Sequence, residues 1–360
     1  MTENLSCKYF QNCGGCYYDN IKSKDYQNFK KIDLIKNLSQ IFNINQLANL
    51  EFIWLDNYSR RRANFHVNNT NKLGFYAVKS HNIIEIDHCL IIDKEIIAIK
   101  KIIEKLIAKN FLNIVQNIII TKFDNCLDII IETKIELNYQ QNQLLVAFAK
   151  ENNVNIATKI NDFTTPLIIK NTPLIKINNY NIKLSYDIFL QANKFFTPKI
   201  IEILSSYIQS IANYKKLKII DLYCGFGIYS YIISDFINKI ESVEGVQLMI
   251  NLMKKNISHY NLNHKISAFT QDLFFEPLSS SYLNKFDLAL INPPRNGASP
   301  QIKEICRSNL TKIIYISCNP KTFIRDSKIL LDFGFKNKKI IAIDQFVGSK
   351  YMELVSFYER

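Results

Sequence analysis

The chain has 360 residues, of which 48% are hydrophobic and 21% charged, a composition that excludes a disordered or fibrous protein and predicts two domains with substantial cores. The formal net charge of +13 favours a polyanionic partner such as RNA or DNA. An anionic membrane surface is the alternative partner, but no strongly amphipathic basic helix supports it.

The first residues lack the basic segment and apolar core of a signal peptide. No apolar run approaches the roughly 18 residues that a membrane-spanning helix needs. Eight cysteines in such a chain indicate metal binding or catalysis rather than a disulfide scaffold. We therefore expect a cytoplasmic protein without membrane contact, and no feature of the sequence calls for an obligate protein partner.

Three cysteines come first along the chain, in the pattern Cys-x5-Cys-Gly-Gly-Cys formed by Cys7, Cys13 and Cys16. Iron–sulfur clusters are usually held by four cysteine thiolates, and zinc can use the same ligands. A fourth ligand would have to come from elsewhere, and Cys89 and Cys126 are the candidates in the N-terminal half. The alternative is three unrelated thiols.

Basic residues mark the next segments. Three consecutive arginines, at positions 60–62, lead into a predicted strand that ends near Val67, and residues 73–76 form the next strand. Arginines beside such a hairpin could contact phosphate. Residues 17–45 predict a helix with a solvated polar face, and an RNA-binding face is the alternative. The basic residues of that face are Lys22, Lys24, Lys30, Lys31 and Lys36.

Residues 92–186 predict a small mixed sheet with two helices, and they carry no cluster of reactive side chains. Asp93 is the expected N-cap of the first helix, and Cys126 is expected in the core. We interpret this part as a scaffold or substrate-recognition domain. The predicted elements are helices over 93–111 and 143–150 and strands over 118–121, 127–132, 154–160, 174–177 and 180–184.

A doubly wound α/β pattern begins near residue 217. The strand over 218–222 leads into the turn Asp-Leu-Tyr-Cys-Gly-Phe-Gly at residues 221–227, and the strand over 242–246 supplies Glu244 near its end. S-adenosylmethionine needs close backbone approach at the glycines and, one βα unit later, an acid for its ribose hydroxyls. The turn and the acid together predict an S-adenosylmethionine site.

Two further strands end in unusual loops. The strand over 286–291 ends in Asn-Pro-Pro-Arg, and the strand over 313–316 ends in Ser-Cys-Asn-Pro, which leads into a helix over 321–331. This places Cys318 at the carboxyl end of a strand, where open α/β sheets build their sites. A helix N-terminus also favours thiolate over thiol. The alternative is a buried structural cysteine. The last two strands are predicted over 339–346 and 354–359.

With these motifs in place, the chain resembles the RNA uracil-5-methyltransferases, which make 5-methyluridine. It is most similar to the iron–sulfur 23S ribosomal RNA members that lack a TRAM domain. The motifs that carry the resemblance are Gln-Ala-Asn at 191–193, the turn at 221–227, Val-Glu-Gly-Val at 243–246, Asn-Pro-Pro-Arg at 292–295, Ser-Cys-Asn-Pro at 317–320, Asp-Gln-Phe at 344–346 followed by Glu353, and, nearer the N-terminus, the cysteine set with Gly-Phe-Tyr at 74–76, Ser-His at 80–81 and Cys89.

The resemblance implies an α/β fold, with an α+β, cluster-bearing RNA-recognition domain over 1–186 and a Rossmann-like class I methyltransferase domain over 187–360. Cys318 would be the nucleophile and Glu353 the base. The implied partner is RNA, and 23S ribosomal RNA is the RNA that we expect. The implied cofactors are S-adenosylmethionine, contacted by Gln191, Tyr223, Glu244 and Asn292, and a [4Fe–4S] cluster on Cys7, Cys13, Cys16 and Cys89.

The chemistry is consistent with these roles. Uracil C5 is a poor nucleophile, but addition of a thiolate at C6 makes C5 an enolate carbon that can take a methyl group. A base must then remove the C5 proton so that the thiol can leave. The target nucleotide must also be unstacked into the pocket.

Three departures from the family pattern and two alternatives remain. The position of Asn292 is Asp in many members, although Asn is also seen. Many members carry a TRAM-type barrel before the cysteines, whereas six residues precede Cys7 here, so we expect substrate choice to rest on about residues 17–190. The loop before Glu353 lacks the family's Pro and His. An N6-adenine or glutamine methyltransferase would also use Asn-Pro-Pro, but with an aromatic residue where Arg295 stands. A non-catalytic iron–sulfur RNA-binding protein is the other alternative.

Overall fold

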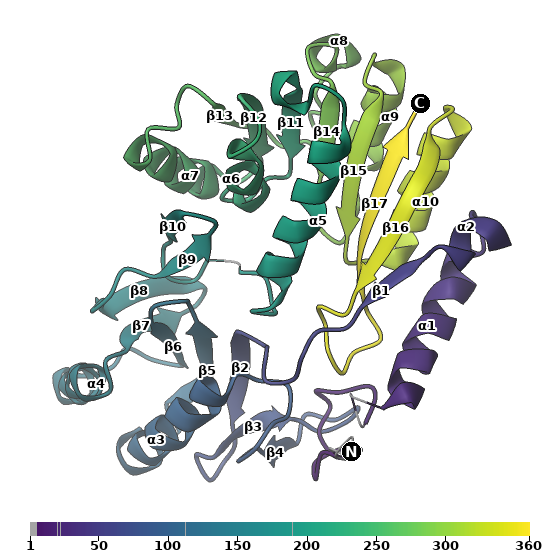
Figure 1. Ribbon diagram of the computed structural model, residues 1–360. Coiled ribbons are helices and arrows are strands. Elements are labelled where there is room, and N and C mark those ends of the chain that lie inside the picture. The colour runs from purple at the N-terminus through teal and green to yellow at the C-terminus, as the bar shows by residue number, and fades with distance from the viewer. Residues whose placement is uncertain (1–5, 20, 22, 112, 189) are drawn as a thin grey trace.

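Two large β-sheets, of eight and seven strands, organise the part of the chain described by the computed structural model, which comprises residues 6–19, 21, 23–111, 113–188 and 190–360 (Figure 1). The eight-stranded sheet contains the C-terminal half and one strand from the N-terminal part. The seven-stranded sheet lies in the N-terminal half. Among the described residues, no helix has the length and apolar character to cross a membrane.

The eight-stranded sheet has the order β1-β16-β17-β15-β14-β11-β12-β13. Its strands are parallel except β17, which is antiparallel to both β15 and β16. The predicted doubly wound pattern is therefore present, with a reversed strand inserted between β15 and β16. The strands are β1 (Glu51–Ile53), β11 (Lys218–Leu222), β12 (Lys239–Glu244), β13 (Ile266–Thr270), β14 (Leu288–Ile291), β15 (Lys312–Ser317), β16 (Lys336–Ile343) and β17 (Glu353–Glu359).

Apolar side chains cover both faces of this sheet, as expected for buried parallel strands. Successive residues of β11 show the alternation, because Ile219 and Ile220 belong to two different cores. Helices α5, α6 and α7 contribute to the first core, and α9 and α10 contribute to the second. The helices are α5 (Phe196–Ser210), α6 (Ile228–Ser234), α7 (Gln247–His259), α8 (Ser280–Leu283), α9 (Ser299–Arg307) and α10 (Pro320–Asp332), with a 3-10 turn at Tyr214–Lys216.

The N-terminal helices pack on the C-terminal sheet, which the sequence did not predict. The single helix expected over 17–45 is two helices, α1 (Lys24–Leu38) and α2 (Ile44–Ala48), and a capping box at Asn43 starts the second. Leu34 and Leu38 enter the core beneath α10. The division at residues 186 and 187 stays a prediction, and residues 24–53 add to the core of the C-terminal sheet.

The seven-stranded sheet has the order β4-β3-β2-β5-β6-β7-β8, and α3 (Lys94–Asn110) and α4 (Tyr139–Asn152) pack against it (Figure 1). Asp93 caps α3 as predicted, because its side chain accepts a hydrogen bond from the backbone of Glu95. The strands are β2 (Arg62–Val67), β3 (Leu73–Tyr76), β4 (Ile83–Glu85), β5 (Val115–Lys122), β6 (Leu127–Thr133), β7 (Asn155–Ile160) and β8 (Phe163–Ile168).

One prediction for this sheet was wrong. The strands β9 (Leu174–Ile177) and β10 (Tyr180–Lys183) form a separate hairpin, and the unpredicted β8 takes the place beside β7. The reason is packing: Ile177 and Ile182 are buried in the core of the C-terminal sheet, beside α6 and α7. The hairpin therefore joins the two halves of the chain rather than extending the sheet.

Candidate active site

Cys318 lies between the end of β15 and the start of α10. Asn319 is the N-cap of α10, and its side-chain oxygen accepts from the backbone N–H of Lys321 at 3.2 Å. Pro320 takes the first helical position, where a missing N–H costs nothing. The predicted placement of Cys318 at a strand's carboxyl end and a helix N-terminus is therefore confirmed.

Glu353 is the first residue of β17 and lies beside Cys318. The antiparallel register pairs Ser317 of β15 with Leu354 of β17, so the next position along each strand brings Cys318 opposite Glu353. Two residues distant in sequence thus share one edge of the sheet.

Burial sets the proton affinities of this pair. Glu353 is only 3% exposed, and this burial raises the pKa of its carboxyl to about 8. Burial also raises the pKa of the Cys318 thiol, and the carboxylate of Glu353 raises it further. The Arg295 guanidinium acts in the opposite direction on the Cys318 pKa, through its charge and a hydrogen bond. A buried carboxyl with a pKa near neutrality can accept and release a proton at physiological pH.

The loop that carries Arg295 is fixed to α10 by a buried carboxylate. Asp326 Oδ2 accepts from the backbone N–H of Ala298 at 2.7 Å and from the hydroxyl of Tyr315 at 2.7 Å. Gly297 has φ +77°, and a Cβ there would lie 2.6 Å from Asp326 Oδ2. The side-chain amide of Asn319 donates to the carbonyl of Arg295 at 2.9 Å. These contacts hold the loop beside Cys318, to which the Arg295 side chain is hydrogen-bonded.

The glycine turn and its acid lie together at the neighbouring strand ends. Glu244, the last residue of β12, accepts hydrogen bonds from the backbone N–H groups of Gly225 and Val246, each at 3.0 Å. Gly225 and Tyr223 have φ values of +59° and +60°. The predicted association of the turn with Glu244 is therefore present in the structure.

The residues expected to contact the cofactor come from two places. Tyr223 and Asn292 directly follow β11 and β14, and Glu244 ends β12; these three strands are adjacent in the sheet. Gln191 instead lies before α5, where its side-chain oxygen accepts from the amide of Gln345 at 2.5 Å. The structure thus places Gln191 against the loop that leads to Glu353.

Buried polar atoms at this edge are left without protein partners. The hydroxyl of Tyr223 and one carboxylate oxygen of Asp221 have no hydrogen bond among the described residues. The other oxygen of Asp221 accepts from Ser230 at 2.6 Å, and burial raises the pKa of Asp221 to about 7. Unsatisfied buried polar atoms are rare in folded proteins, and a polar ligand such as S-adenosylmethionine would account for the one on Tyr223. This site therefore fits that cofactor.

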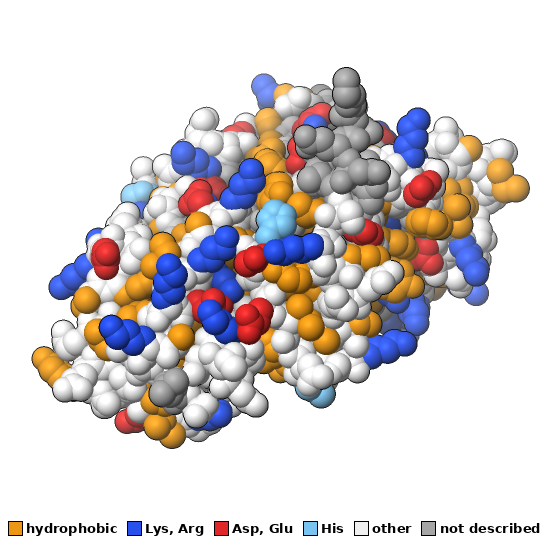
Figure 2. Space-filling model, turned by 90° about the horizontal axis from the view of Figure 1, so that it is seen from below, with side chains coloured by type: hydrophobic (Ala, Val, Ile, Leu, Met, Phe, Trp, Pro, Cys, Tyr) orange, Lys and Arg blue, Asp and Glu red, His pale blue; other side chains and the backbone are white. Residues whose placement is uncertain are grey.

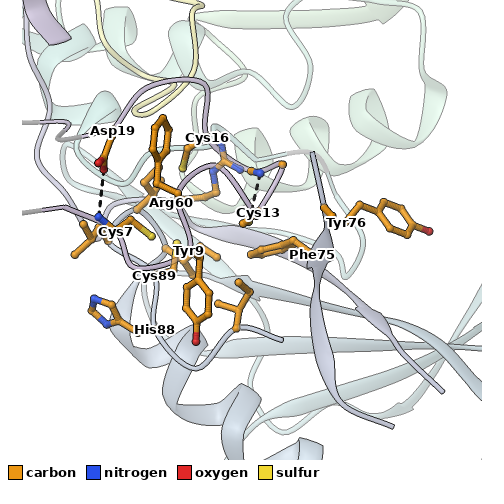
Figure 3. A pocket seen from close by; sticks show the side chains of 18 of the residues that line it. Cys7, Tyr9, Cys13, Cys16, Asp19, Arg60, Phe75, Tyr76, His88 and Cys89 are labelled. Carbon is orange, nitrogen blue, oxygen red and sulfur yellow. Dashed lines mark hydrogen bonds between the residues drawn. The ribbon is translucent and has the colours of Figure 1, made fainter. Parts of the chain in front are cut away.

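A separate cavity of about 350 Å³ brings together the four cysteines Cys7, Cys13, Cys16 and Cys89 (Figure 3). Burial raises the pKa of the Cys13, Cys16 and Cys89 thiols, to about 12 for Cys16, whereas the nearby Arg60 lowers the pKa of Cys16 and Cys89. The chemistry of the set fits a cluster held by four thiolates. No three His, Cys, Asp or Glu side chains in the described ranges are arranged to hold a metal ion as they stand.

The second candidate for a fourth ligand, Cys126, lies elsewhere. Its buried thiol is near Asp128 and Asn155 in the seven-stranded sheet, as expected for a core residue. Cys89 is thus the cysteine of the two that joins the N-terminal set at one cavity.

One interpretation of a basic residue was wrong. Lys30 is 1% exposed instead of solvated, because Tyr26, Lys30 and Leu34 lie four residues apart on the buried stripe of α1. That spacing was the signal in the sequence. Arg61 and Arg62 form ion pairs with Asp124 at 2.7 Å and Asp187 at 3.0 Å. The phosphate contact of the arginine run stays a prediction. Lys22 lies outside the described residues.

The fold and this site define an α/β methyltransferase of the S-adenosylmethionine-dependent class. The chain belongs to the tRNA (uracil-5-)-methyltransferase family, whose sequence model matches residues 25–360. It is therefore an enzyme that methylates C5 of uridine in RNA, as predicted. The alternatives of an amine methyltransferase and of a non-catalytic RNA-binding protein are excluded by this membership.

Individual relatives and a solved structure agree with the family. An RNA methyltransferase of Caulobacter vibrioides without an assigned target is 28% identical, over 99% of this chain and 86% of its own length. A 23S rRNA (uracil(1939)-C(5))-methyltransferase RlmD of Pasteurella multocida is 25% identical, over 99% of this chain and 82% of its own length. The Pyrococcus abyssi tRNA (uracil-54, C5)-methyltransferase, solved with S-adenosyl-L-homocysteine, shares the fold, with a TM-score of 0.74, 20% identity and coverage of 93% of this chain and 83% of that one.

The buried carboxyl of Glu353 gives a prediction for stability. The unfolded chain ionises Glu353 above about pH 4.5, but the folded protein does so only near pH 8, so folding loses stability across this window. Glu353→Gln should therefore be more stable than the parent by about 2–4 kcal/mol at pH 8 and equally stable at pH 4. Urea titrations at both values measure this, with Glu359→Gln at the other end of β17 as control. Equal stability of parent and variant at pH 8 would mean that the carboxylate is well solvated.

Proposed function

We propose that Cys318 and Glu353 are the nucleophile and the base of uridine methylation, and that the substrate is 23S ribosomal RNA. The observation that supports the pair most directly is the register of β15 and β17, which brings the two side chains opposite each other. A nucleotide flipped into this edge could present C6 to one side chain and the C5 hydrogen to the other.

Formation of the thiolate is the first requirement. Burial opposes it, because it raises the pKa of Cys318. Arg295 and the N-terminus of α10 favour it, since both place positive charge near the sulfur. In this proposal the loop over 292–297 therefore has an electrostatic role beside its place at the cofactor site.

Removal of the C5 proton is the second requirement. Burial raises the pKa of the Glu353 carboxyl to about 8, and such a carboxyl is a stronger base than an exposed glutamate. S-adenosylmethionine supplies the methyl group when bound. The residues proposed to bind it are Gln191, Tyr223, Glu244 and Asn292.

Two variants separate the proposed roles. Cys318→Ala should bind RNA and cofactor but form no covalent adduct, because no other thiol or hydroxyl is proposed to reach C6. In Glu353→Gln, Cys318 should still add to C6 of the uracil ring and the methyl group should still be transferred. Elimination should not follow, so methylated RNA stays attached through Cys318. The measurement is denaturing electrophoresis after incubation with methyl-labelled cofactor.

A labelled, RNA-dependent band with Glu353→Gln and none with Cys318→Ala is the expected result. Cys306→Ala, which changes a buried cysteine of α9 away from the strand ends, is the matched control and should turn over normally. Normal turnover by Glu353→Gln would identify another group as the base.

The choice of 23S ribosomal RNA is supported by the names of several relatives, which are 23S rRNA (uracil(1939)-C(5))-methyltransferases. The family description instead names tRNA, and the basic surface suits either RNA. Figure 2 shows Lys and Arg side chains spread over the face seen from below. The adduct experiment should therefore be run with a 23S fragment and with tRNA, and only the 23S fragment should yield the labelled band.

Cofactor binding gives a further prediction. Glu244 is held on the glycine turn by two backbone hydrogen bonds, and its carboxylate would pair with the ribose hydroxyls. Glu244→Ala should weaken S-adenosylmethionine binding by about 1.5–3 kcal/mol, the range for hydrogen bonds to a charged group. Isothermal titration calorimetry measures this. Glu276→Ala, on the loop after β13, is the control, and an unchanged dissociation constant for Glu244→Ala would contradict the assignment.

We also propose that Cys7, Cys13, Cys16 and Cys89 hold a structural [4Fe–4S] cluster. Their common cavity supports this, as does the exclusion of Cys126 from it. Anaerobically purified protein should be brown and contain about four irons per chain, the content of one cubane. Cys16→Ser should lose this iron, whereas Cys126→Ser should keep it. Stoichiometric zinc in the parent protein would contradict the proposal.

A further inference from the structure

We propose that Lys30 and Tyr26 of α1 are positioning residues for the base Glu353, acting through the loop over 344–352. This rests on the proposed role of Glu353. It assigns a catalytic contribution to a helix that lies more than 300 residues earlier in the chain, as the separations of 314 and 318 residues in its contacts with Asp344 show.

The loop is closed by one buried ammonium group. Lys30 Nζ donates to Asp344 Oδ1 at 2.5 Å and to the backbone carbonyl of Tyr351 at 2.8 Å. Asp344 directly follows β16, and Tyr351 stands two residues before Glu353. Lys30 therefore ties the two ends of the loop together.

The hydroxyl of Tyr26 fixes the middle of the same loop. It donates to Asp344 Oδ2 at 2.7 Å and accepts from the backbone N–H of Gly348 at 3.0 Å. The carbonyl of Gly348 in turn accepts from the backbone N–H of Tyr17 at 2.7 Å. The loop is thus bound at its start, middle and end by the N-terminal segment.

The space around Gly348 allows little movement. Gly348 has φ +79°, and a Cβ there would lie 3.3 Å from the sulfur of Cys16. The loop therefore packs directly against the cysteine-bearing segment, which also lines the cavity of Figure 3. Displacement of this segment would be transmitted to the loop through hydrogen bonds and contact.

A buried ion pair is not required merely to hold α1 against the rest of the fold. Lys30 and Asp344 are both almost fully buried, and desolvation of two charges commonly offsets their attraction, so an apolar pair of similar volume often stabilises a protein as well. What an apolar pair could not supply is the bond from Lys30 to the carbonyl of Tyr351. That bond fixes the backbone immediately before Glu353.

The step that depends on this placement is elimination. Glu353 takes the C5 proton, the electrons of the C5–H bond form the C5–C6 double bond, and the C6–S bond breaks to release the Cys318 thiolate. Addition and methyl transfer need Cys318 and the cofactor. Cys318 is not on the loop, and the loop touches a proposed cofactor residue at its start, where the amide of Gln345 donates to Gln191. A displaced loop should therefore slow elimination more than the earlier steps.

The test compares Tyr26→Phe with Tyr207→Phe. Like Tyr26, Tyr207 donates its hydroxyl to a carboxylate, here that of Glu359. Glu359 ends β17, at the opposite end of the strand from Glu353, so Tyr207→Phe is a matched control for loss of a tyrosine hydroxyl. Both are prepared in the full-length protein with its cofactor. The readouts are the steady-state amount of methyl-labelled covalent adduct, kcat, and the dissociation constant for S-adenosylmethionine.

Tyr26→Phe should lower the elimination rate by about ten- to a hundredfold, the effect of small misplacements of a catalytic group. Adduct should accumulate, with cofactor affinity unchanged, whereas Tyr207→Phe should behave as the parent. The double variant Lys30→Met with Asp344→Leu replaces the buried ion pair by two apolar side chains. It should fold and should also accumulate adduct.

Absence of adduct in both Tyr26→Phe and the double variant, while Glu353→Gln accumulates it, would overturn this inference and leave the role of Glu353 intact. Absence of adduct in Glu353→Gln would instead contradict the proposed function. An equal fall in every step, with a lower unfolding midpoint and no adduct, would show that α1 has only a structural role.

Discussion

The antiparallel pairing of β17 with β15 is the constraint on which the site depends. In a wholly parallel sheet, the first residue of every strand would lie at the amino edge, far from the carboxyl edge where ligands bind. Because β17 runs in the opposite direction, its first residue, Glu353, lies at the carboxyl edge beside Cys318. The reversal therefore places Glu353, the proposed base, at the edge where the parallel strands carry Cys318 and the glycine turn.

Burial then gives the two side chains their chemical character. The same loss of solvent raises the pKa of Glu353 and of Cys318, which favours the base but opposes the thiolate. Arg295 compensates at the sulfur, and it is held there because Asp326 anchors its loop to α10. Ionisation of the buried Glu353 carboxyl reduces stability, and the proposed role of Glu353 as base requires the same charge, a conflict found at many active sites.

The sequence predicted the parts of this arrangement that are local. Cys318 before a helix, the glycine turn at 221–227 and the N-cap Asp93 all depend on neighbours in the chain. The contacts made by side chains far apart in sequence were not predictable in the same way. Lys30 matched a solvated helix face, and only the fold supplies Asp344 as its partner. Likewise, β9 and β10 were correctly predicted as strands, but their place beside α6 and α7 depends on where the core lies.

The central claim is that Cys318 adds to the uridine that Glu353 later deprotonates. The direct measurement is mass spectrometric mapping of the parent enzyme after incubation with S-adenosylmethionine and RNA that contains 5-fluorouridine at the target. A base cannot remove fluorine as it removes a proton, so the methylated adduct should be trapped. The account predicts one modified peptide, with the methylated nucleotide on Cys318. Attachment to any other residue, or release of the RNA without an adduct, would contradict it.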